Sequence, residues 1–311
     1  MTGYITDFSG NIYRLPELIS WEICHTDGTR GTDSFDISTV YSEEMKSPLE
    51  NAVRIRIEHD GRTVFCGIID EYRISRAENG RRVSISGRGM GGVLLDNKCA
   101  GQEFISCTLK EILNRYVYPL GITDVESVGA PVVNGYSVET GDSCFSAISG
   151  FLDRALGTTP RFDWNGRLIL SGCTGERYVL SENAAVKIET VGRRYGVVSQ
   201  VDVMTARGYM TAVRNDRFIK SGGAAKRVIT VPLNTSLHEM KYAGKRIIDE
   251  SERERYVIEI TAPQLFPVFP GDIIEADTPE IVPGAYHVAE TVCSGGADGA
   301  GTKIILTKRV K

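Results

Sequence analysis

The segment from Arg81 to Asn97 has the sequence RRVSISGRGMGGVLLDN, and it separates a part of the chain that alternates like β-strands from a part with helical spacing. Val83 and Ile85 alternate with polar residues, which is the period of a strand with one buried face. The glycines that follow let the backbone adopt a positive φ and turn sharply. The segment therefore predicts a strand over residues 82–86 that ends at the exit of a β domain.

The glycines of this segment match the G-x-G-x-x-G spacing of dinucleotide-binding loops at Gly87, Gly89 and Gly92. Such a loop joins a buried parallel strand to the N-terminus of a helix that binds the pyrophosphate. Here the strand is amphipathic and follows other amphipathic strands, and the segment after the glycines is too short for that helix. We therefore interpret the glycines as a domain exit, and we expect no nucleotide cofactor.

Length and composition indicate a folded chain of several domains. The chain has 311 residues, of which 41% are hydrophobic and 24% charged, and this is enough for two or three domains with real cores. The net charge is −4, divided as −3 over residues 1–92, −4 over 93–190 and +3 over 191–311. Because this asymmetry is mild, we expect no stable binding to a phosphate backbone.

The cysteines are odd in number, scattered, and without a C-x-x-C pair; they are Cys24, Cys66, Cys99, Cys107, Cys144, Cys173 and Cys293. This pattern argues against a disulfide framework and against a metal site, so reduced thiols in a cytosolic product are expected. The N-terminus lacks the features of a signal peptide, and no apolar run reaches the roughly 18 residues of a membrane span. We expect release from the cell only by lysis or inside a larger particle.

Residues 1–92 are predicted to form an antiparallel β domain. Alternating runs occur at 19–23, 34–38, 53–58, 63–70 and 82–86. The dipeptides Asp60-Gly61 and Asn79-Gly80 are typical of tight hairpin turns, so the last three runs form a meander. Such a set closes most readily into a small barrel or sandwich. The face with Arg54, Arg56 and Glu58 is expected to be solvated or to face another subunit.

Residues 93–190 have the pattern of a small α+β domain. Thr108 and Glu111 have the spacing of a capping box, which predicts a helix start. Asp142 is predicted to cap a second helix that ends at Gly157. Asn165-Gly166 lies between alternating runs and predicts a hairpin.

Residues 191–311 are predicted to form a second β-barrel-like domain. Its strands are expected near 197–204, 228–231, 256–260, 273–276, 285–290 and 302–307. A capping box at Ser236 and Glu239 predicts a helix over about 236–253, inserted between the early and the late strands. The predicted fold class is mainly β with an α+β insert, in which two small β-barrel-like domains flank a small α+β domain.

No motif in the sequence predicts catalysis. The four histidines His25, His59, His238 and His287 lie far apart. Gly141-Asp142-Ser143 resembles a block found in serine hydrolases, but helix capping explains its Asp and Ser. We therefore expect no catalytic residues, no metal and no cofactor, and we predict that the protein is not an enzyme.

Several short motifs, taken in their order, resemble a known family. They are Gly67-Ile68-Ile69-Asp70, Ser86-Gly87-Arg88 followed by Val93-Leu94-Leu95-Asp96, Phe162 to Leu168, and Phe269-Pro270-Gly271-Asp272. The chain resembles the baseplate or tail hub proteins of contractile-tailed phages and phage-tail-like bacteriocins, in the branch typified by the hub of defective Bacillus prophages. It departs from them at Gly89, where family members commonly have an acidic or polar residue.

The resemblance implies a homotrimer. In that family two barrel-like domains per subunit give six similar barrels, and this pseudo-sixfold ring joins the sixfold tail tube to the threefold spike. The implied partners are further copies of the chain, the tail tube protein, the central spike protein, and a baseplate wedge or LysM-type hub neighbour. The implied location is the cytoplasm during assembly and then the baseplate of a virion or bacteriocin tail.

Two other functions remain open from the residues. A tail-associated cell-wall hydrolase of the lysozyme or peptidase type would need a pair of carboxylates or a Ser/His pair in a cleft. A β-rich carbohydrate-recognition module would need exposed aromatic side chains, and the chain is 8% aromatic without clustered Trp. The sequence favours the structural hub over both.

Two segments are predicted to lie at interfaces between subunits. Two phenylalanines beside prolines in a loop are hard to bury locally, and this selects one turn. The N-terminal segment from residue 4 to residue 13 is the other. The predicted interface residues are Phe266, Phe269, Pro270, Gly271 and Asp272 in the turn, and Tyr4, Phe8 and Tyr13 in the N-terminal segment.

Overall fold

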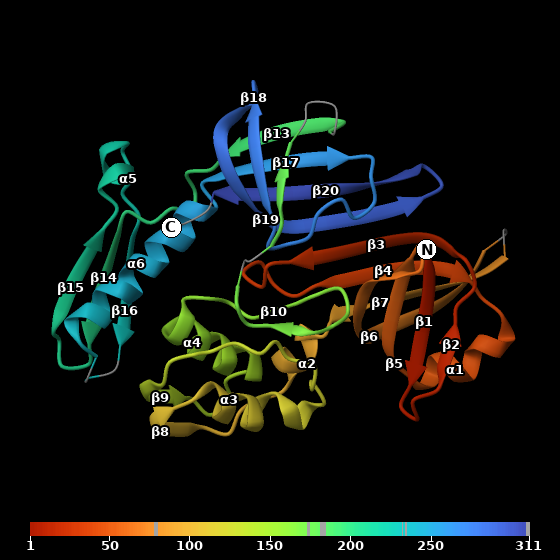
Figure 1. The fold of residues 1–311 in the computed structure, drawn as a ribbon, viewed down its shortest axis with the longest axis horizontal. Helices are drawn as coiled ribbons and strands as arrows, with labels where there is room; N and C mark the ends of the chain where they lie inside the picture. The colour runs from red at the N-terminus through yellow and green to blue at the C-terminus, as the bar shows by residue number, and fades with distance from the viewer. Residues whose placement is uncertain (78–79, 173–174, 181–184, 232, 234, 309–311) are drawn as a thin grey trace. The chain divides into compact units, whose positions relative to one another are not determined.

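The computed structural model describes residues 1–77, 80–172, 175–180, 185–231, 233 and 235–308 (Figure 1). Strands dominate and a few helices accompany them, so the predicted fold class, mainly β with an α+β insert, is confirmed. The chain forms two compact units. Unit 1 comprises Met1–Glu176, Ala262–Asp272 and Val288–Ile304, and unit 2 comprises the rest. The three domains predicted with boundaries at 92 and 190 stay a prediction.

Unit 1 contains an antiparallel sheet in which neighbouring strands run in the order β3-β4-β7-β6-β5-β1-β2. The strands are β1 (Thr2–Asp7), β2 (Ile12–Arg14), β3 (Leu18–Thr26), β4 (Ser34–Val40), β5 (Ala52–His59), β6 (Arg62–Ala77) and β7 (Gly80–Gly89). The 3-10 helix η1 (Glu43–Met45) and α1 (Lys46–Asn51) lie between β4 and β5. The meander predicted for β5, β6 and β7 is present, with Asp60 at a positive φ in its first turn.

The inner face of this sheet is built by the residues that alternate in the sequence. Ile37, Ile57 and Ile85 are completely buried, and the rings of Phe35 and Phe65 lie 5.3 Å apart among them. β6 shifts register between Ile69 and Glu71, a β-bulge that places Asp70 outside the regular pairing with β7.

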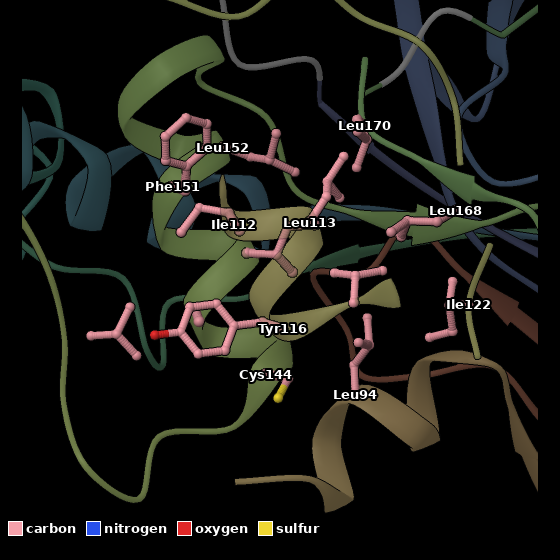
Figure 2. Close-up of a cluster of buried hydrophobic side chains, with 14 of the residues drawn as sticks. Leu94, Ile112, Leu113, Tyr116, Ile122, Cys144, Phe151, Leu152, Leu168 and Leu170 are labelled. Carbon is pink, nitrogen blue, oxygen red and sulfur yellow. The ribbon is translucent and has the colours of Figure 1, made fainter. Parts of the chain in front are cut away.

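The α+β insert of unit 1 follows β7 directly. Its elements are α2 (Gly91–Asp96), β8 (Gln102–Cys107), α3 (Leu109–Tyr116), η2 (Tyr118–Leu120), β9 (Val133–Val138), α4 (Cys144–Leu156), β10 (Arg161–Phe162) and β11 (Leu168–Ile169). Figure 2 shows Leu94, Ile112, Leu152 and Leu168 converging from different elements on one core. The predicted Asn165-Gly166 hairpin joins β10 to β11.

The cap predicted for the second helix is wrong by one residue. Ser143, not Asp142, is the N-cap of α4, and its hydroxyl accepts a hydrogen bond from the backbone N–H of Ser146 at 3.0 Å. The carboxylate of Asp142 instead accepts from the backbone N–H of Glu139 at 3.1 Å. Both residue types cap helices well, so the sequence alone did not separate the two neighbours.

The capping box at the start of α3 gives a first stability prediction. The hydroxyl of Thr108 accepts from the N–H of Glu111 at 3.3 Å, and the Glu111 carboxylate accepts from the N–H of Thr108 at 2.8 Å. Thr108→Ala is therefore expected to lower the free energy of unfolding by about 1 kcal/mol in urea titrations. Lys110→Ala is the control, because Lys110 is exposed in the same first turn and caps nothing. Equal midpoints for Thr108→Ala and the unmodified chain would contradict the prediction.

Unit 2 contains β12 (Arg177–Val179), β13 (Lys187–Gly192), most of β17 (Tyr256–Ala262), β18 (Ile273–Thr278) and the first part of β19 (Ile281–Gly296). β13 pairs antiparallel with β17, and β18 pairs with β12 and β19. The last part of β20 (Gly299–Lys308) also belongs to this unit, while the remainders of β19 and β20 belong to unit 1.

A separate three-stranded sheet lies between β13 and β17 in the sequence. Its strands β14 (Gln200–Thr205), β15 (Met210–Arg214) and β16 (Lys226–Val231) have the order β15-β14-β16, and β14 runs parallel to β16. The helices of this segment are α5 (Asp216–Lys220) and α6 (Leu237–Arg253); α6 lies across the sheet (Figure 1). The helix predicted over about 236–253 is thus present, and Ser236 is its N-cap.

The strands predicted near 197–204 and 228–231 lie in this separate sheet, whereas β17, β18, β19 and β20 lie in the larger sheet. The physical reason is the amphipathic helix α6. Its buried Met240 and Ile248 cover Val201 and Val203, so the segment closes a hydrophobic core of its own.

Candidate interaction site

The N-terminal turn between β1 and β2 is held by one carboxylate. Asp7 accepts hydrogen bonds from the backbone N–H groups of Ser9 and Asn11, both at 2.9 Å, and from the side chains of Asn11 and Tyr13 at 3.0 and 3.3 Å. These bonds, the one from the Asn11 side chain above all, lower the pKa of Asp7. The turn therefore has a fixed shape, and it presents the Phe8 ring with 73% of its surface exposed.

The same turn begins an open edge of the sheet. Ile12 is 63% exposed and Tyr13 is 37% exposed, beside Phe8. β2 pairs with β1 alone among the described strands, so the other side of β2 offers backbone N–H and C=O groups to a further strand. An exposed apolar group next to an open edge is typical of a surface that binds another chain.

Tyr4, the third N-terminal candidate, has a different environment. Its ring lies under the guanidinium of Arg56, 4.8 Å from centroid to Cζ, and Arg56 also pairs with Glu58 at 3.0 Å. Arg54 and Arg56 line one side of a groove of about 290 Å³, and the backbone at Gly121 lines the other. The sheet face that was expected to be solvated or subunit-facing is thus an open, partly cationic groove.

The turn that follows Phe266 is packed within unit 1. Phe269 is 7% exposed and stacks on Trp164 with ring centroids 4.1 Å apart. The carboxylate of Asp272 accepts from the backbone N–H groups of Phe269 and Glu176 at 2.8 and 3.0 Å, and burial raises its pKa. The chain therefore buries Phe269, although its ring was expected to be hard to bury locally.

Two further residues of that turn, Gly271 and Phe266, have a positive φ. Gly271 has a φ of +107°, a conformation that favours glycine, in the turn that also contains Pro270. Phe266 is half-buried with a φ of +50° and lies 6.4 Å from Trp164 between centroids. The interface role of all five residues of this turn, like that of Tyr4, Phe8 and Tyr13, stays a prediction.

A buried histidine lies at the centre of this aromatic cluster. The His25 ring is 1% exposed and lies 4.9 Å from Phe269, 5.6 Å from Phe65 and 5.9 Å from Trp164. Neither ring nitrogen has a hydrogen-bond partner among the residues that the structure describes, and burial lowers the pKa of His25 to about 3. No local sequence pattern predicts this cluster, because its members are far apart in the chain.

Comparison with known proteins identifies the fold. No family model and no curated protein matches the chain. Among solved structures, the tail protein from Neisseria meningitidis MC58 matches 99% of this chain over 96% of its own, with a TM-score of 0.76 and 16% identity. The 43 kDa tail protein of prophage MuSo2 from Shewanella oneidensis matches 98% of this chain over 97% of its own, with a TM-score of 0.77 and 15% identity. The chain has the fold of phage tail proteins.

The tail-protein fold extends beyond phages. The Escherichia coli c3393 protein, described as a component of the type VI secretion system with structural similarity to the T4 tail proteins gp27 and gp5, matches 95% of this chain over 74% of its own. Its TM-score is 0.56 at 11% identity. The resemblance that the motifs predicted is therefore confirmed at the level of the fold.

Two of the motifs behind that resemblance meet at one point of the tail-protein fold. The guanidinium of Arg88 donates to both carboxylate oxygens of Asp70, at 2.7 and 2.8 Å, and to both of Asp96, at 2.8 Å each. Its hydrogen bonds lower the pKa of Asp96. Arg88 thus joins the bulge of β6 to the end of α2, and residues from two of the four motifs form a single ion cluster.

The histidines and Ser143, which were weighed as catalytic candidates, do not lie together in the described part of the chain. His59 lies 3.5 Å from Asp60 at a turn, His238 is exposed on α6, and His287 is buried in β19. Ser143 is occupied as a helix cap. No group of three or more His, Cys, Asp or Glu suited to a metal occurs within the described ranges, nor does any described helix have the length and apolarity to cross a membrane.

Proposed function

We propose that the protein is a structural, non-catalytic component of a phage tail or of a phage-tail-like particle. The observation that carries this proposal is the likeness to two tail proteins along almost the entire length of both partners, with TM-scores of 0.76 and 0.77. Because the matches cover 99% and 98% of this chain, they extend over the β-sheets, the α+β insert and α6, and are not limited to one common substructure.

The finer proposal is a hub that joins the sixfold tail tube to the threefold spike as a pseudo-sixfold homotrimer. The motif resemblance supports it, and so does the likeness to a secretion-system protein described as similar to gp27 and gp5. Each chain has two compact units rich in antiparallel strands, so three copies would supply six. Closed symmetry would reuse one interface three times.

The proposed partners are further copies of this chain, the tube protein, the spike protein, and a baseplate wedge or LysM-type hub neighbour. The proposed location is the cytoplasm during assembly and the tail baseplate afterwards. The open edge of β2, with Phe8 and Ile12 beside it, supports a protein partner, because strand addition there would pair backbone groups and cover apolar surface together.

The test is the oligomeric state of the purified chain, followed by imaging of the assembled particle. Light scattering after gel filtration should give three times the mass of one chain, and the particle should show a threefold ring between tube and spike. A stable monomer that binds neither the tube protein nor the spike protein would refute the proposed hub function. Clearing on a peptidoglycan zymogram would favour the hydrolase, and a sharp hit on a glycan array would favour the recognition module.

Phe8→Ser tests the N-terminal surface directly. Because the ring is 73% exposed, its removal should change the free energy of unfolding by less than about 0.5 kcal/mol. If the ring lies at the centre of the trimer interface, the trimer dissociation constant should rise by a factor of about 30 or more. Ile105→Ser is the matched control, since Ile105 is 94% exposed and lies outside the predicted interface residues. An equal effect of both substitutions on assembly would reject Phe8 as an anchor.

A further inference from the structure

The segment between β13 and β17 has a charge opposite to that of the rest of the chain. Residues 193–255 contain 13 Lys and Arg against 7 Asp and Glu, a net charge of +6, whereas the remaining residues contain 23 against 33, a net charge of −10. This segment, here named the basic module, comprises the sheet β15-β14-β16 with α5 and α6. The net charge of the longer segment 191–311 hides this contrast, because residues 256–311 contain 4 Lys and Arg against 7 Asp and Glu and so offset part of the module's charge.

Five cations lie together where the basic module meets strands β13, β17 and β20 within unit 2. A hollow of about 350 Å³ lies there, and its charged lining consists of Arg193, Arg194, Arg217, Arg255, Lys308 and Glu252. We name this hollow the neck site. Five cations face one carboxylate, so the neck site has a surplus of positive charge.

The carboxylates close to the neck site do not cancel this surplus. Glu252 accepts hydrogen bonds from the Asn215 side chain at 2.7 Å and from Arg255 at 3.2 Å. Glu254 lies 3.5 Å from Arg193. Within the described part of the chain, neither Arg217 nor Lys308 has an ion-pair partner within 4.0 Å. Two cations at the neck site are therefore available to an external anion.

Aromatic rings hold several of these cations in place. Phe218 is buried, and the guanidinium groups of Arg194 and Arg255 lie 5.5 and 5.3 Å from its centroid. The ammonium of Lys308 lies 5.2 Å from the centroid of Tyr256. Because these side chains are already held in place, they lose little conformational entropy when a ligand binds. A bound anion would also reduce the repulsion between the neighbouring cations.

We propose that the neck site binds an acidic segment on the next copy of this chain. The proposal deepens the proposed homotrimer and rests on it. Charge complementarity supports this contact, because the basic module has a net charge of +6 and the remainder of each copy has a net charge of −10. A threefold ring needs a contact between two different patches, and a basic patch against an acidic one is such a contact. The hollow has the size for a few carboxylate side chains, which arginine binds through paired hydrogen bonds.

The first test is charge reversal at the two available cations. Arg217→Glu/Lys308→Glu should raise the trimer dissociation constant by a factor of about 100 and remove most of its salt dependence between low and high ionic strength. Both side chains are exposed, so the variant should unfold at the wild-type temperature. Lys241→Glu/Lys245→Glu is the matched control, because it makes the same change of charge on the exposed face of α6 outside the neck site and should raise the constant less than about 5-fold.

The second test is zero-length crosslinking with a carbodiimide, which joins a lysine amine only to a carboxylate in contact with it. In a trimer made from light and heavy isotope-labelled chains, Lys308 should crosslink to an Asp or Glu of another copy. Lys308→Arg should keep assembly within about 3-fold of wild type and lose the crosslink, because the charge remains and the amine does not.

Three outcomes separate the alternatives. A wild-type trimer whose neck variant assembles as tightly as the control overturns the neck-site inference and leaves the hub intact. A wild-type monomer refutes the homotrimer and the inference with it. If a 20-base-pair DNA duplex binds the wild type, the neck variant loses that binding and the trimer is unchanged, the occupant is nucleic acid and the inference is overturned.

Discussion

Gly87→Ala is expected to destabilise unit 1 by about 3 kcal/mol or to prevent its folding. A Cβ atom on Gly87 would lie 2.1 Å from the carbonyl oxygen of Ile68, 2.8 Å from the Phe35 ring and 3.0 Å from the backbone nitrogen of Asp70. Two of these atoms belong to the backbone of the paired strand β6, so relief would require the β6–β7 ladder to open. The substitution would also disturb Arg88, the next residue, and its ion cluster.

The measurement is urea unfolding followed by circular dichroism, with a second glycine as comparison and a third as control. Gly67→Ala should have a similar effect, because its Cβ would lie 2.2 Å from the carbonyl oxygen of Arg88. Gly192→Ala should change stability by less than about 0.5 kcal/mol, since it has open space around it and no positive φ. If the unfolding curves of Gly87→Ala and Gly192→Ala coincide, β6 and β7 accommodate the added Cβ atom without losing stability, and the prediction is wrong.

The second large effect is a pair of opposed pH dependences. His25 has its pKa lowered to about 3 by burial, so between pH 3 and 6.5 the unfolded chain binds a proton at this residue and the folded chain does not. This residue therefore removes stability as the pH falls below 6.5, by up to about 1.4 kcal/mol per pH unit. His25→Leu should abolish the loss, and its stability relative to wild type should rise as the pH falls from 6.5 towards 4.

Asp33 acts in the opposite direction. Its carboxyl group is buried, accepts a hydrogen bond from the backbone N–H of Thr26 at 2.8 Å, and has its pKa raised to about 7 by burial. Between about pH 4 and 7 the folded chain binds a proton at this residue and the unfolded chain does not. Stability from this residue is therefore lost as the pH rises through that window. Asp33→Asn keeps the acceptor for Thr26, and its stability relative to wild type should rise with pH.

Guanidinium unfolding at half-unit pH steps from 4 to 7 checks both substitutions against the wild type. Because only differences from wild type are compared, titrations elsewhere in the chain cancel. The two difference curves should slope in opposite directions. Parallel or flat difference curves would mean that the pKa of His25 or of Asp33 is the same in the folded and the unfolded chain.

Features with a local period were predictable from the sequence. The strands β5 and β7 follow from Ile55, Ile57, Val83 and Ile85, because alternation over a few residues fixes which face is buried. The helices α3 and α6 follow from capping boxes that span four residues. The predicted cap of α4 was wrong by one residue because Asp and Ser are favoured about equally as N-caps, and Asp142 and Ser143 are neighbours.

Features that depend on contacts between distant residues were not predictable. Trp164 and Phe269 stack around His25, and Arg88 joins Asp70 to Asp96, although nothing in the spacing of these residues connects them. That β14, β15 and β16 form a sheet of their own was not predictable for the same reason. A strand's own residues show which face is apolar, but they do not show which strand it pairs with.

The basic module leaves and re-enters the sheet at adjacent points. Gly192 is paired with Tyr256, and the backbone N–H of Arg193 donates to the carbonyl of Arg255 at 2.8 Å. β13 and β17 therefore pair as the two strands of a hairpin do, and the basic module is the connection between them. A two-residue Asn-Gly turn could close the same ladder, and a foreign domain with neighbouring termini could be grafted there. Exchange of this loop would let related particles acquire different attachments while the strands beneath it stay as they are.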